Sequence, residues 1–501
     1  MNKELENNLE YIMNQLAIAD EYQHACHVLN FDMETICPEK SMEEQGEVIA
    51  FLSNKAFRII KEKSFIEKEQ YLFQHLNQLD GYEKIMVETL KRDYNKTKNI
   101  TPELNHEITL AKNKAYVSWM NAKAAKDFSI FEKDLERVIN LQRKEMTLRE
   151  DNLSMYDRML DDYDRGMTEK KIDEAFNECK RRLIPLLNEI KNSKKEIRTD
   201  FLYRPVTEEA QKEMATYLLE TIGFDFTRGS FSTTEHPFTD TMGKDDTRIT
   251  TNYKNSDITA NLYTVVHEGG HALFDMNQPR ENFKYFITGN KTMGQHESVS
   301  RFYENRIGRS KGFIHYIFPK MKEILKDALY DVTEDEFYAA VNRVEPSLVR
   351  TDADEFTYTF HVIIRYEIEK AVTKGEIDIA QIPQMWSDKY FQYLGIRPEN
   401  DSQGCLQDVH WTEGFGYFPS YALGNMYNGM YYNKMMEDFN IEEAVAKGDF
   451  ITINNWMKEH VFAKADRLDS SDWIVDITGK EFTADDFLDY LEDKYRKIYE
   501  L

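Results

Sequence analysis

The sequence predicts a mainly α-helical protein in which one short β-region separates two series of helices. Through residues 3–223, apolar side chains recur three and four positions apart, which is the period of amphipathic helices. From about 223 to 254 this spacing gives way to aromatic residues, threonines and glycines, with alternation in Thr247-Arg248-Ile249-Thr250-Thr251. Only 11 prolines and 21 glycines occur in 501 residues, and none gather into a linker. We therefore expect one domain spanning residues 1–501.

Helices before the β-region are delimited by short polar breaks and by residues that favour helix starts. Thr101-Pro102, Thr168-Glu169 and Thr207-Glu208-Glu209 are starts of this kind, because a threonine hydroxyl can accept a hydrogen bond from a free N–H of the first turn. The expected helices lie near 3–30, 40–62, 82–97, 102–126, 130–150, 169–192 and 207–221.

Helices are expected again after the small sheet, in the part of the chain from residue 224 to 501. A loop-rich, aromatic stretch from about 397 to 425 interrupts them. The expected helices lie near 257–276, 296–309, 334–344, 355–373, 386–394, 441–447, 450–461 and 483–499.

Composition excludes several classes of protein. With 41% hydrophobic residues in 59.3 kDa, the chain can bury a large core without disulfides. A net charge of −25 disfavours nucleic acid and anionic membranes as partners, because both would repel it. The four cysteines form no C-x-x-C pair, the N-terminus lacks an apolar signal core, and no 18-residue apolar run occurs. We expect a cytoplasmic protein with reduced thiols.

The most informative motif is His267-Glu268-Gly269-Gly270-His271. Histidines four positions apart project side by side from one helix face, so both can bind a single Zn²⁺ ion. Glu268 then lies beside the metal, where it can take a proton from an activated water. Ser256-Asp257-Ile258-Thr259 offers residue types that favour a helix start just before the motif. A second pair, His24 and His27, has no obvious acidic partner, and we interpret it as structural.

A catalytic zinc site needs a third protein ligand and keeps one position open for water. Downstream of the motif, His296-Glu297-Ser298 begins another expected helix and offers two residues that can bind metal. On chemistry alone, Glu297 and His296 are rivals for the third position.

Further motifs are those of a known family. Five further motifs of this family occur here in the family's order. They are His236-Pro237-Phe238, Asp246-Thr247-Arg248-Ile249-Thr250, His296-Glu297-Ser298, Val349-Arg350-Thr351-Asp352-Ala353-Asp354 and Gly404-Cys405-Leu406-Gln407-Asp408-Val409-His410-Trp411. With them, the chain resembles the thermostable carboxypeptidases of the Taq type, family 32 of the metallopeptidases. Segments near residues 30–35 and 160–168 extend the resemblance over nearly the whole chain. Gly269 is a departure, because the family usually carries a bulkier apolar residue there.

The resemblance implies roles for individual residues. It makes His267, His271 and Glu297 the metal ligands and Glu268 the general base. His410 and a tyrosine, Tyr421 before Tyr417, are the candidates for stabilising the oxyanion. Arg350 is the first candidate for binding a free C-terminal carboxylate and Arg248 the second, since a guanidinium can donate two parallel hydrogen bonds. His236 is a further candidate for contacting substrate.

The resemblance also implies a fold and partners. It predicts a neurolysin-like, multi-helix metallopeptidase in which helices of residues 1–223 roof a deep groove and a small sheet lies near the zinc helix. It further implies a cytoplasmic homodimer that acts on peptides with a free C-terminus and binds one divalent ion per chain, Zn²⁺ or Co²⁺. Two alternatives remain: an endo-acting zinc oligopeptidase with the same metal chemistry, and a non-catalytic helical binding protein stabilised by metal. Glu268 argues against the second, since a structural metal site needs no base.

Overall fold

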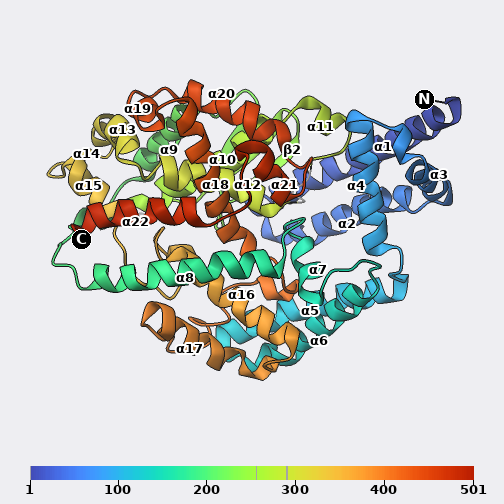
Figure 1. Ribbon diagram of the computed structural model, residues 1–501, viewed down its shortest axis with the longest axis horizontal. Helices are drawn as coiled ribbons and strands as arrows, with labels where there is room; N and C mark the ends of the chain where they lie inside the picture. The colour runs from blue at the N-terminus through green and yellow to red at the C-terminus, as the bar shows by residue number, and fades with distance from the viewer. Residues whose placement is uncertain (1, 255–256, 289–291) are drawn as a thin grey trace.

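The computed structural model describes all residues except 1, 255–256 and 289–291 (Figure 1). It confirms a mainly α-helical protein with one small sheet between two series of helices. Most predicted helices are present within a few residues of their expected bounds. Among the described residues, the sequence patterns missed seven helices: α3 (Lys63–Gln74), α7 (Met155–Asp161), α11 (Arg280–Lys284), α13 (Lys311–Ile324), α14 (Lys326–Leu329), α18 (Pro419–Asp438) and α21 (Ser470–Thr478).

The first helices surround a hydrophobic core of their own. They are α1 (Lys3–Thr35), α2 (Met42–Ile60), α3 and α4 (Gly81–Thr97), and Figure 1 shows them at one end of the molecule. Their buried side chains are Leu5, Leu9, Ile12, Phe65, Leu72, Leu79, Met86 and Val87. Since α1 also contacts β2, this end of the molecule is joined to the sheet that borders the predicted metal helix.

A second, much larger core runs through the rest of the chain, from Leu104 to Tyr499. The next helices are α5 (Pro102–Ala125), α6 (Ser129–Thr147), α7, α8 (Glu169–Lys191) and α9 (Glu208–Ile222). The hydroxyl of Thr168 accepts from Lys171 N at the start of α8, as the sequence predicted. Helix α8 lies beside the last helix, α22 (Asp485–Tyr499), where Arg182 pairs with Glu492 (Figure 1). Elements far apart in sequence are thus packed together.

The sheet has three strands in the order β1-β3-β2. Strands β1 (Gly229–Thr233) and β3 (Asp246–Thr251) are parallel, whereas β2 (Thr239–Gly243) is antiparallel to β3, with Thr239 opposite Ile249. Strands β2 and β3 both contact α10 (Ile258–Met276), the helix of the HExxH motif. The prediction of a small sheet beside this helix is confirmed.

The remaining helices complete the larger core. They are α10, α11 (Arg280–Lys284), α12 (Met293–Arg301), a π-helical turn (Phe302–Ile307), α13, α14 (Lys326–Leu329), α15 (Glu334–Val341), α16 (Tyr358–Lys374), α17 (Ile382–Leu394), α18 (Pro419–Asp438), α19 (Ile441–Ala446), α20 (Phe450–His460), α21 and α22.

Helix α18 corrects one expectation, because it begins inside the stretch 397–425 that the sequence predicted as loop. Its glycines and asparagines have low helix propensity, and it is buried on nearly all sides, so no amphipathic pattern marks it. Packing stabilises it instead. A Cβ atom at Gly424 would lie 2.9 Å from the Cγ atom of Glu297, so glycine lets α18 approach α12 closely.

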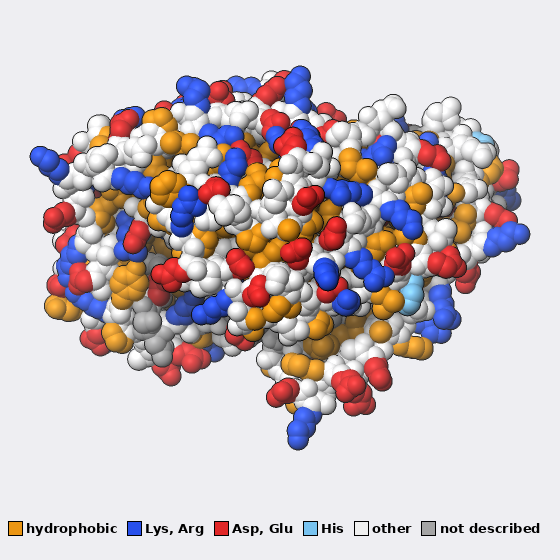
Figure 2. Space-filling view, turned by 90° about the horizontal axis from the view of Figure 1, so that it is seen from below, with side chains coloured by type: hydrophobic (Ala, Val, Ile, Leu, Met, Phe, Trp, Pro, Cys, Tyr) orange, Lys and Arg blue, Asp and Glu red, His pale blue; other side chains and the backbone are white. Residues whose placement is uncertain are grey.

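The surface carries both signs of charge. On the face shown in Figure 2, acidic and basic side chains are interspersed with hydrophobic atoms. Among the described residues, no helix is both long and apolar enough to span a membrane.

Candidate metal centre and its surroundings

Helix α10 presents the HExxH motif within the larger core. Its N-cap is Asp257, whose Oδ1 accepts from the backbone N–H groups of Thr259 and Ala260; Ser256 lies outside the described residues. A Cβ atom at Gly270 would lie 2.7 Å from the Cα atom of Ser300, so this glycine allows α12 to pack directly on α10. At Gly269, side chains of α9 occupy the space that a bulkier residue would need. The two glycines thus serve close packing.

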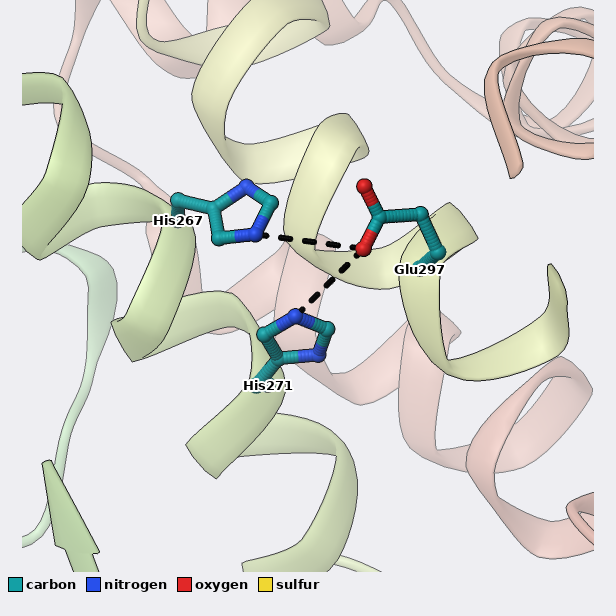
Figure 3. Close-up of side chains that lie close together, drawn as sticks. All are labelled: His267, His271 and Glu297. Carbon is teal, nitrogen blue, oxygen red and sulfur yellow. Dashed lines mark ion pairs between the residues drawn. The ribbon is translucent and has the colours of Figure 1, made fainter. Parts of the chain in front are cut away.

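Three possible ligand atoms converge between α10 and α12. The Nε2 atoms of His267 and His271 lie 3.9 and 3.5 Å from Oε2 of Glu297, and all three atoms lie within 4.8 Å of one another (Figure 3). Two imidazoles and one carboxylate suit Zn²⁺, and three protein ligands leave a position for water. The residues present therefore fit a divalent metal ion.

The other nitrogen of each histidine has a buried partner. Nδ1 of His267 lies 2.9 Å from Oε2 of Glu304. Nδ1 of His271 lies 2.5 Å from Nδ1 of His296, whose Nε2 lies 3.0 Å from Oδ1 of Asp275. Such partners fix the ring orientation of metal-binding histidines. His296 thus lies behind His271, whereas Glu297 faces both Nε2 atoms.

Arg301 joins the two carboxylates of this centre. Its Nε donates to Oε1 of Glu297 at 2.8 Å, and its Nη1 donates to Oε2 of Glu304 at 3.1 Å. Burial alone would raise the pKa of Glu297, but Arg301 and the two histidines outweigh it and hold that pKa well below its usual range. Burial, reinforced by His296, lowers the pKa of His271 to about 4. At neutral pH Glu297 is therefore a carboxylate and His271 is neutral, the forms that bind metal. Burial lowers the pKa of His267, but Glu297 and Glu304 outweigh it and raise that pKa, so metal binding there competes with a proton.

Glu268 lies on the same helix between the two histidines and is 8% exposed. The hydroxyl of Thr239 in β2 donates to its Oε2 at 2.6 Å. Burial raises the pKa of Glu268, and the neighbouring His267 and Thr239 offset part of that effect. A carboxylate of raised pKa is better suited to accept a proton near neutral pH.

A row of packed side chains leads from the metal centre to Arg350. The guanidinium of Arg301 lies 4.1 Å from the ring centroid of Tyr358, and the hydroxyl of Tyr358 accepts from Nη1 of Arg350 at 3.0 Å. The guanidinium of Arg350 in turn lies 4.5 Å from the ring centroid of Tyr421. The structure therefore brings Arg350 and Tyr421, which are 71 positions apart, into contact beside the metal centre.

Tyr421 also meets the two other candidates for oxyanion stabilisation. Its hydroxyl lies 3.0 Å from Nε2 of His410 and 3.4 Å from the hydroxyl of Tyr417. Burial lowers the pKa of His410 to about 4, so its ring is neutral at pH 7 and carries a single N–H. These three side chains form one polar cluster at the start of α18.

Arg350 belongs to a buried charge cluster. Its Nε and Nη2 donate to Oδ1 of Asp408 at 3.1 and 3.0 Å, and Nε of Arg365 donates to Oδ2 of the same carboxylate at 2.7 Å. Two guanidinium groups thus share one carboxylate, which leaves one excess positive charge in the hydrogen-bonded cluster. The two arginines outweigh burial and hold the pKa of Asp408 well below its usual range.

The other two predicted substrate contacts lie elsewhere. Arg248 forms a bidentate pair with Asp246 and lies 5.3 Å from the ring centroid of Phe31 in α1. His236 is exposed in the segment before β2. Arg248 therefore contacts helix α1, while the structure groups Arg350 with His410 and Tyr421.

Sequence reasoning missed several residues that contact the centre. Arg301 and Asp275 each lie four positions after a predicted ligand, Glu297 and His271, so helical spacing could have revealed both. Thr239 lies 29 positions before Glu268, and Tyr358 lies 57 positions after Arg301, so no local spacing links either residue to the metal centre.

The fold and the donor set define a class of helical proteins in which an HExxH helix and a downstream glutamate form one metal centre. The chain matches the family described as Carboxypeptidase Taq (M32) metallopeptidase over residues 11–495. It is 36% identical over 480 residues to carboxypeptidase 1 of Bacillus subtilis, covering 95% of this chain and 96% of the relative. It is 32% identical to thermostable carboxypeptidase 1 of Pyrococcus furiosus, covering 94% and 95%.

A solved structure agrees with these sequence relatives. The M32 carboxypeptidase from Deinococcus radiodurans R1 superimposes with a TM-score of 0.94 at 30% identity, covering 99% of this chain and 100% of that chain. The chain therefore belongs to the carboxypeptidase Taq family of metallopeptidases, and it is a metallocarboxypeptidase.

Proposed function

We propose that the enzyme removes single residues from the free C-terminus of peptides and that Arg350 binds the substrate carboxylate. The observation that carries the proposal is the excess positive charge where Arg350 and Arg365 share Asp408. A carboxylate placed there would neutralise the cluster, and a buried charge pair of this kind contributes strongly to specificity.

Arg350 retains the hydrogen-bond donors that this role needs. A guanidinium has five N–H groups. Nε, Nη1 and Nη2 each use one of them on Asp408 or Tyr358, which leaves one N–H on Nη1 and one on Nη2. Two N–H groups on adjacent nitrogens match the two oxygens of a carboxylate.

The proposed chemistry divides among the other residues of the site. His267, His271 and Glu297 would hold the divalent ion, with zinc or cobalt as the proposed metal. When bound, such an ion supplies a water of lowered pKa and polarises a carbonyl group. Glu268 takes the proton from the attacking water and returns it to the leaving amine. His410 and Tyr421 donate hydrogen bonds to the oxygen on which negative charge develops.

The resemblance to the family supports further proposals on organisation. We infer a single domain, a homodimer and a cytoplasmic location without nucleic acid or membrane partners. The four free cysteines support a reducing compartment, and the net charge of −25 supports the absence of polyanionic partners.

Mass spectrometry of two peptides tests the proposed direction of cleavage. One peptide carries a free C-terminus and its twin an amidated one, and both are incubated with metal-loaded enzyme. We expect stepwise loss of single residues from the free peptide and strong discrimination against the amide. Equal cleavage of both, with internal bonds broken first, would contradict the proposal and favour an oligopeptidase.

A further inference from the structure

Strand β2 is hydrogen-bonded to α10, the helix of the HExxH motif, through two hydroxyl groups. The Thr239 hydroxyl lies 2.6 Å from Oε2 of Glu268 and 3.0 Å from its carbonyl oxygen, and the Thr241 hydroxyl donates to Oδ2 of Asp275 at 2.7 Å. Residues two apart in a strand share a face, and residues seven apart in a helix also share a face. One face of β2 therefore bonds to α10 at two points, one at Glu268 and one behind His271.

The opposite face of β2 is attached to α1. Nδ1 of His24 lies 2.6 Å from the carbonyl oxygen of Met242, and Nδ1 of His27 lies 3.2 Å from Oδ2 of Asp240. The histidine pair in α1 thus has partners in β2, and one of them is an acidic residue, Asp240, which the sequence alone did not reveal. Because β3 pairs with β2 along its edge, the strand is held from two sides before its threonines meet α10.

From this arrangement we propose that Thr239 is a positioning residue for Glu268 and that Thr241 positions His271 through Asp275 and His296. The proposal rests on the proposed function, since it takes Glu268 as the general base and His271 as a ligand. Strand β2 would then set the orientation of both groups on one helix.

The role of Thr239 follows from the freedom of a glutamate side chain. A glutamate has three rotatable torsions, whereas a threonine in a strand is restricted at its single χ1 torsion. The hydroxyl of Thr239 occupies Oε2 of Glu268 and leaves Oε1 for the attacking water. A carboxylate that is already fixed needs no further ordering in the transition state. Loss of the hydrogen bond from Thr239 should therefore lower kcat rather than change KM.

The role of Thr241 follows from the order of donors behind His271. Asp275 accepts from the Nε2–H of His296, so Nδ1 of His296 can accept from the Nδ1–H of His271. That arrangement leaves Nε2 of His271, the atom facing Glu297, free to bind metal. Thr241 supports Asp275 at the far end of this relay, and such outer partners strengthen metal binding.

Valine substitutions test the two roles, because valine keeps the shape of threonine without its hydroxyl. We expect Thr239→Val to lower kcat about tenfold or more, with KM and metal content near the wild-type values. Thr239→Ser keeps the hydroxyl and should restore most of kcat. A kcat for Thr239→Val within about twofold of wild type, or a Thr239→Ser variant as slow as Thr239→Val, would overturn the role of Thr239.

Metal retention tests the second role independently of activity. In competition with a chelator, we expect Thr241→Val to lose zinc roughly threefold faster than the wild type. Thr233→Val is the matched control, since Thr233 is exposed on the opposite edge strand, β1. Equal loss from Thr241→Val and Thr233→Val would overturn the role of Thr241. If Glu268→Gln is inactive while Thr239→Val is normal, only the positioning role fails; an active, metal-loaded Glu268→Gln would refute the proposed function itself.

Discussion

The two halves of the active site are built in different ways. The metal half comes from two adjacent helices, with His267 and His271 one turn apart on α10 and Glu297 on α12. The other half, which we propose binds the substrate carboxylate and which we call the carboxylate-binding half, assembles Arg350, Asp408 and Tyr421 from a 3-10 turn, a loop and the start of α18. Local spacing therefore places the two histidines of the first half, whereas tertiary packing brings Glu297 to them and assembles the whole of the second half.

The difference also appears in how charge is arranged. In the metal half, the three carboxylates of Glu268, Glu297 and Glu304 outnumber the two guanidinium groups, of Arg301 and Arg309, that pair with Glu297 and Glu304. In the carboxylate-binding half, Arg350 and Arg365 share Asp408, so cationic groups are in excess. Each half thus has the charge opposite to its expected ligand, a divalent cation in one case and a carboxylate in the other.

The largest effect is expected within the metal half, on catalysis alone. Glu268→Gln should lower kcat at least about a hundredfold, because the general base is lost while the three ligands remain. Elemental analysis should still find about one metal ion per chain, as three protein ligands suffice for a catalytic site. Substantial turnover by a fully metal-loaded variant would rule out this mechanism.

Substitutions of Glu297 and His296 distinguish a metal ligand from a residue that only supports a ligand in the same half. Glu297→Ala removes the carboxylate that faces both Nε2 atoms, so bound zinc should fall to a small fraction of one ion per chain. His296→Ala removes the partner of His271 Nδ1 and of Asp275 but no ligand atom, so we expect a smaller loss, roughly tenfold in affinity. Zinc titration with a competing chelator measures both. The reverse order would make His296 the third ligand.

In the other half, Arg350→Ala should reduce kcat/KM for a peptide with a free C-terminus roughly thirtyfold, the equivalent of about 2 kcal/mol. The amidated peptide should be affected much less, because a neutral terminus does not use the positive charge. Arg248→Ala is the control, since Arg248 pairs with Asp246 and packs on α1. If Arg350→Ala still discriminates between the free and the amidated peptide while Arg248→Ala does not, the residue that binds the carboxylate is Arg248.

The contrast between the halves also explains what the sequence could predict. Helical periods and the i, i+4 rule depend on neighbours in the chain, so the helices, the sheet position and the HExxH pair could be predicted from spacing. The start of α18 could not, because its burial on nearly all sides removes the amphipathic pattern. Tyr358 and Thr239 lacked any local signal, since their contacts with Arg301 and Glu268 join elements that only the folded chain brings together.

Glu369, in α16, holds the loop of the carboxylate-binding half. This buried carboxylate accepts from Trp411 Nε1, from the backbone N–H of Gly416 and from the hydroxyl of Tyr156. Two of these donors, Trp411 and Gly416, lie near the two ends of the segment from His410 to Tyr417. No arginine or lysine is among them, so burial raises the pKa of Glu369 to about 7.

The smallest expected effect is the pH dependence that this carboxyl gives to stability. Its pKa is higher in the folded than in the unfolded chain, so the folded state binds the extra proton and stability falls as pH rises from about 4.5 to 7. The glutamine of the Glu369→Gln variant cannot titrate. Because one of its amide hydrogens must face a hydrogen-bond donor, the variant should be less stable than the wild type at low pH. One proton changes the free energy of unfolding by at most about 1.4 kcal/mol per pH unit, so the difference between the two proteins should shrink by about 1 kcal/mol between about pH 5.5 and 6.5. Urea unfolding of both proteins at these pH values measures the difference, and metal binding cancels when both carry the same metal load. A constant difference across this range would show that Glu369 keeps one protonation state and that neutral donors alone stabilise its charge.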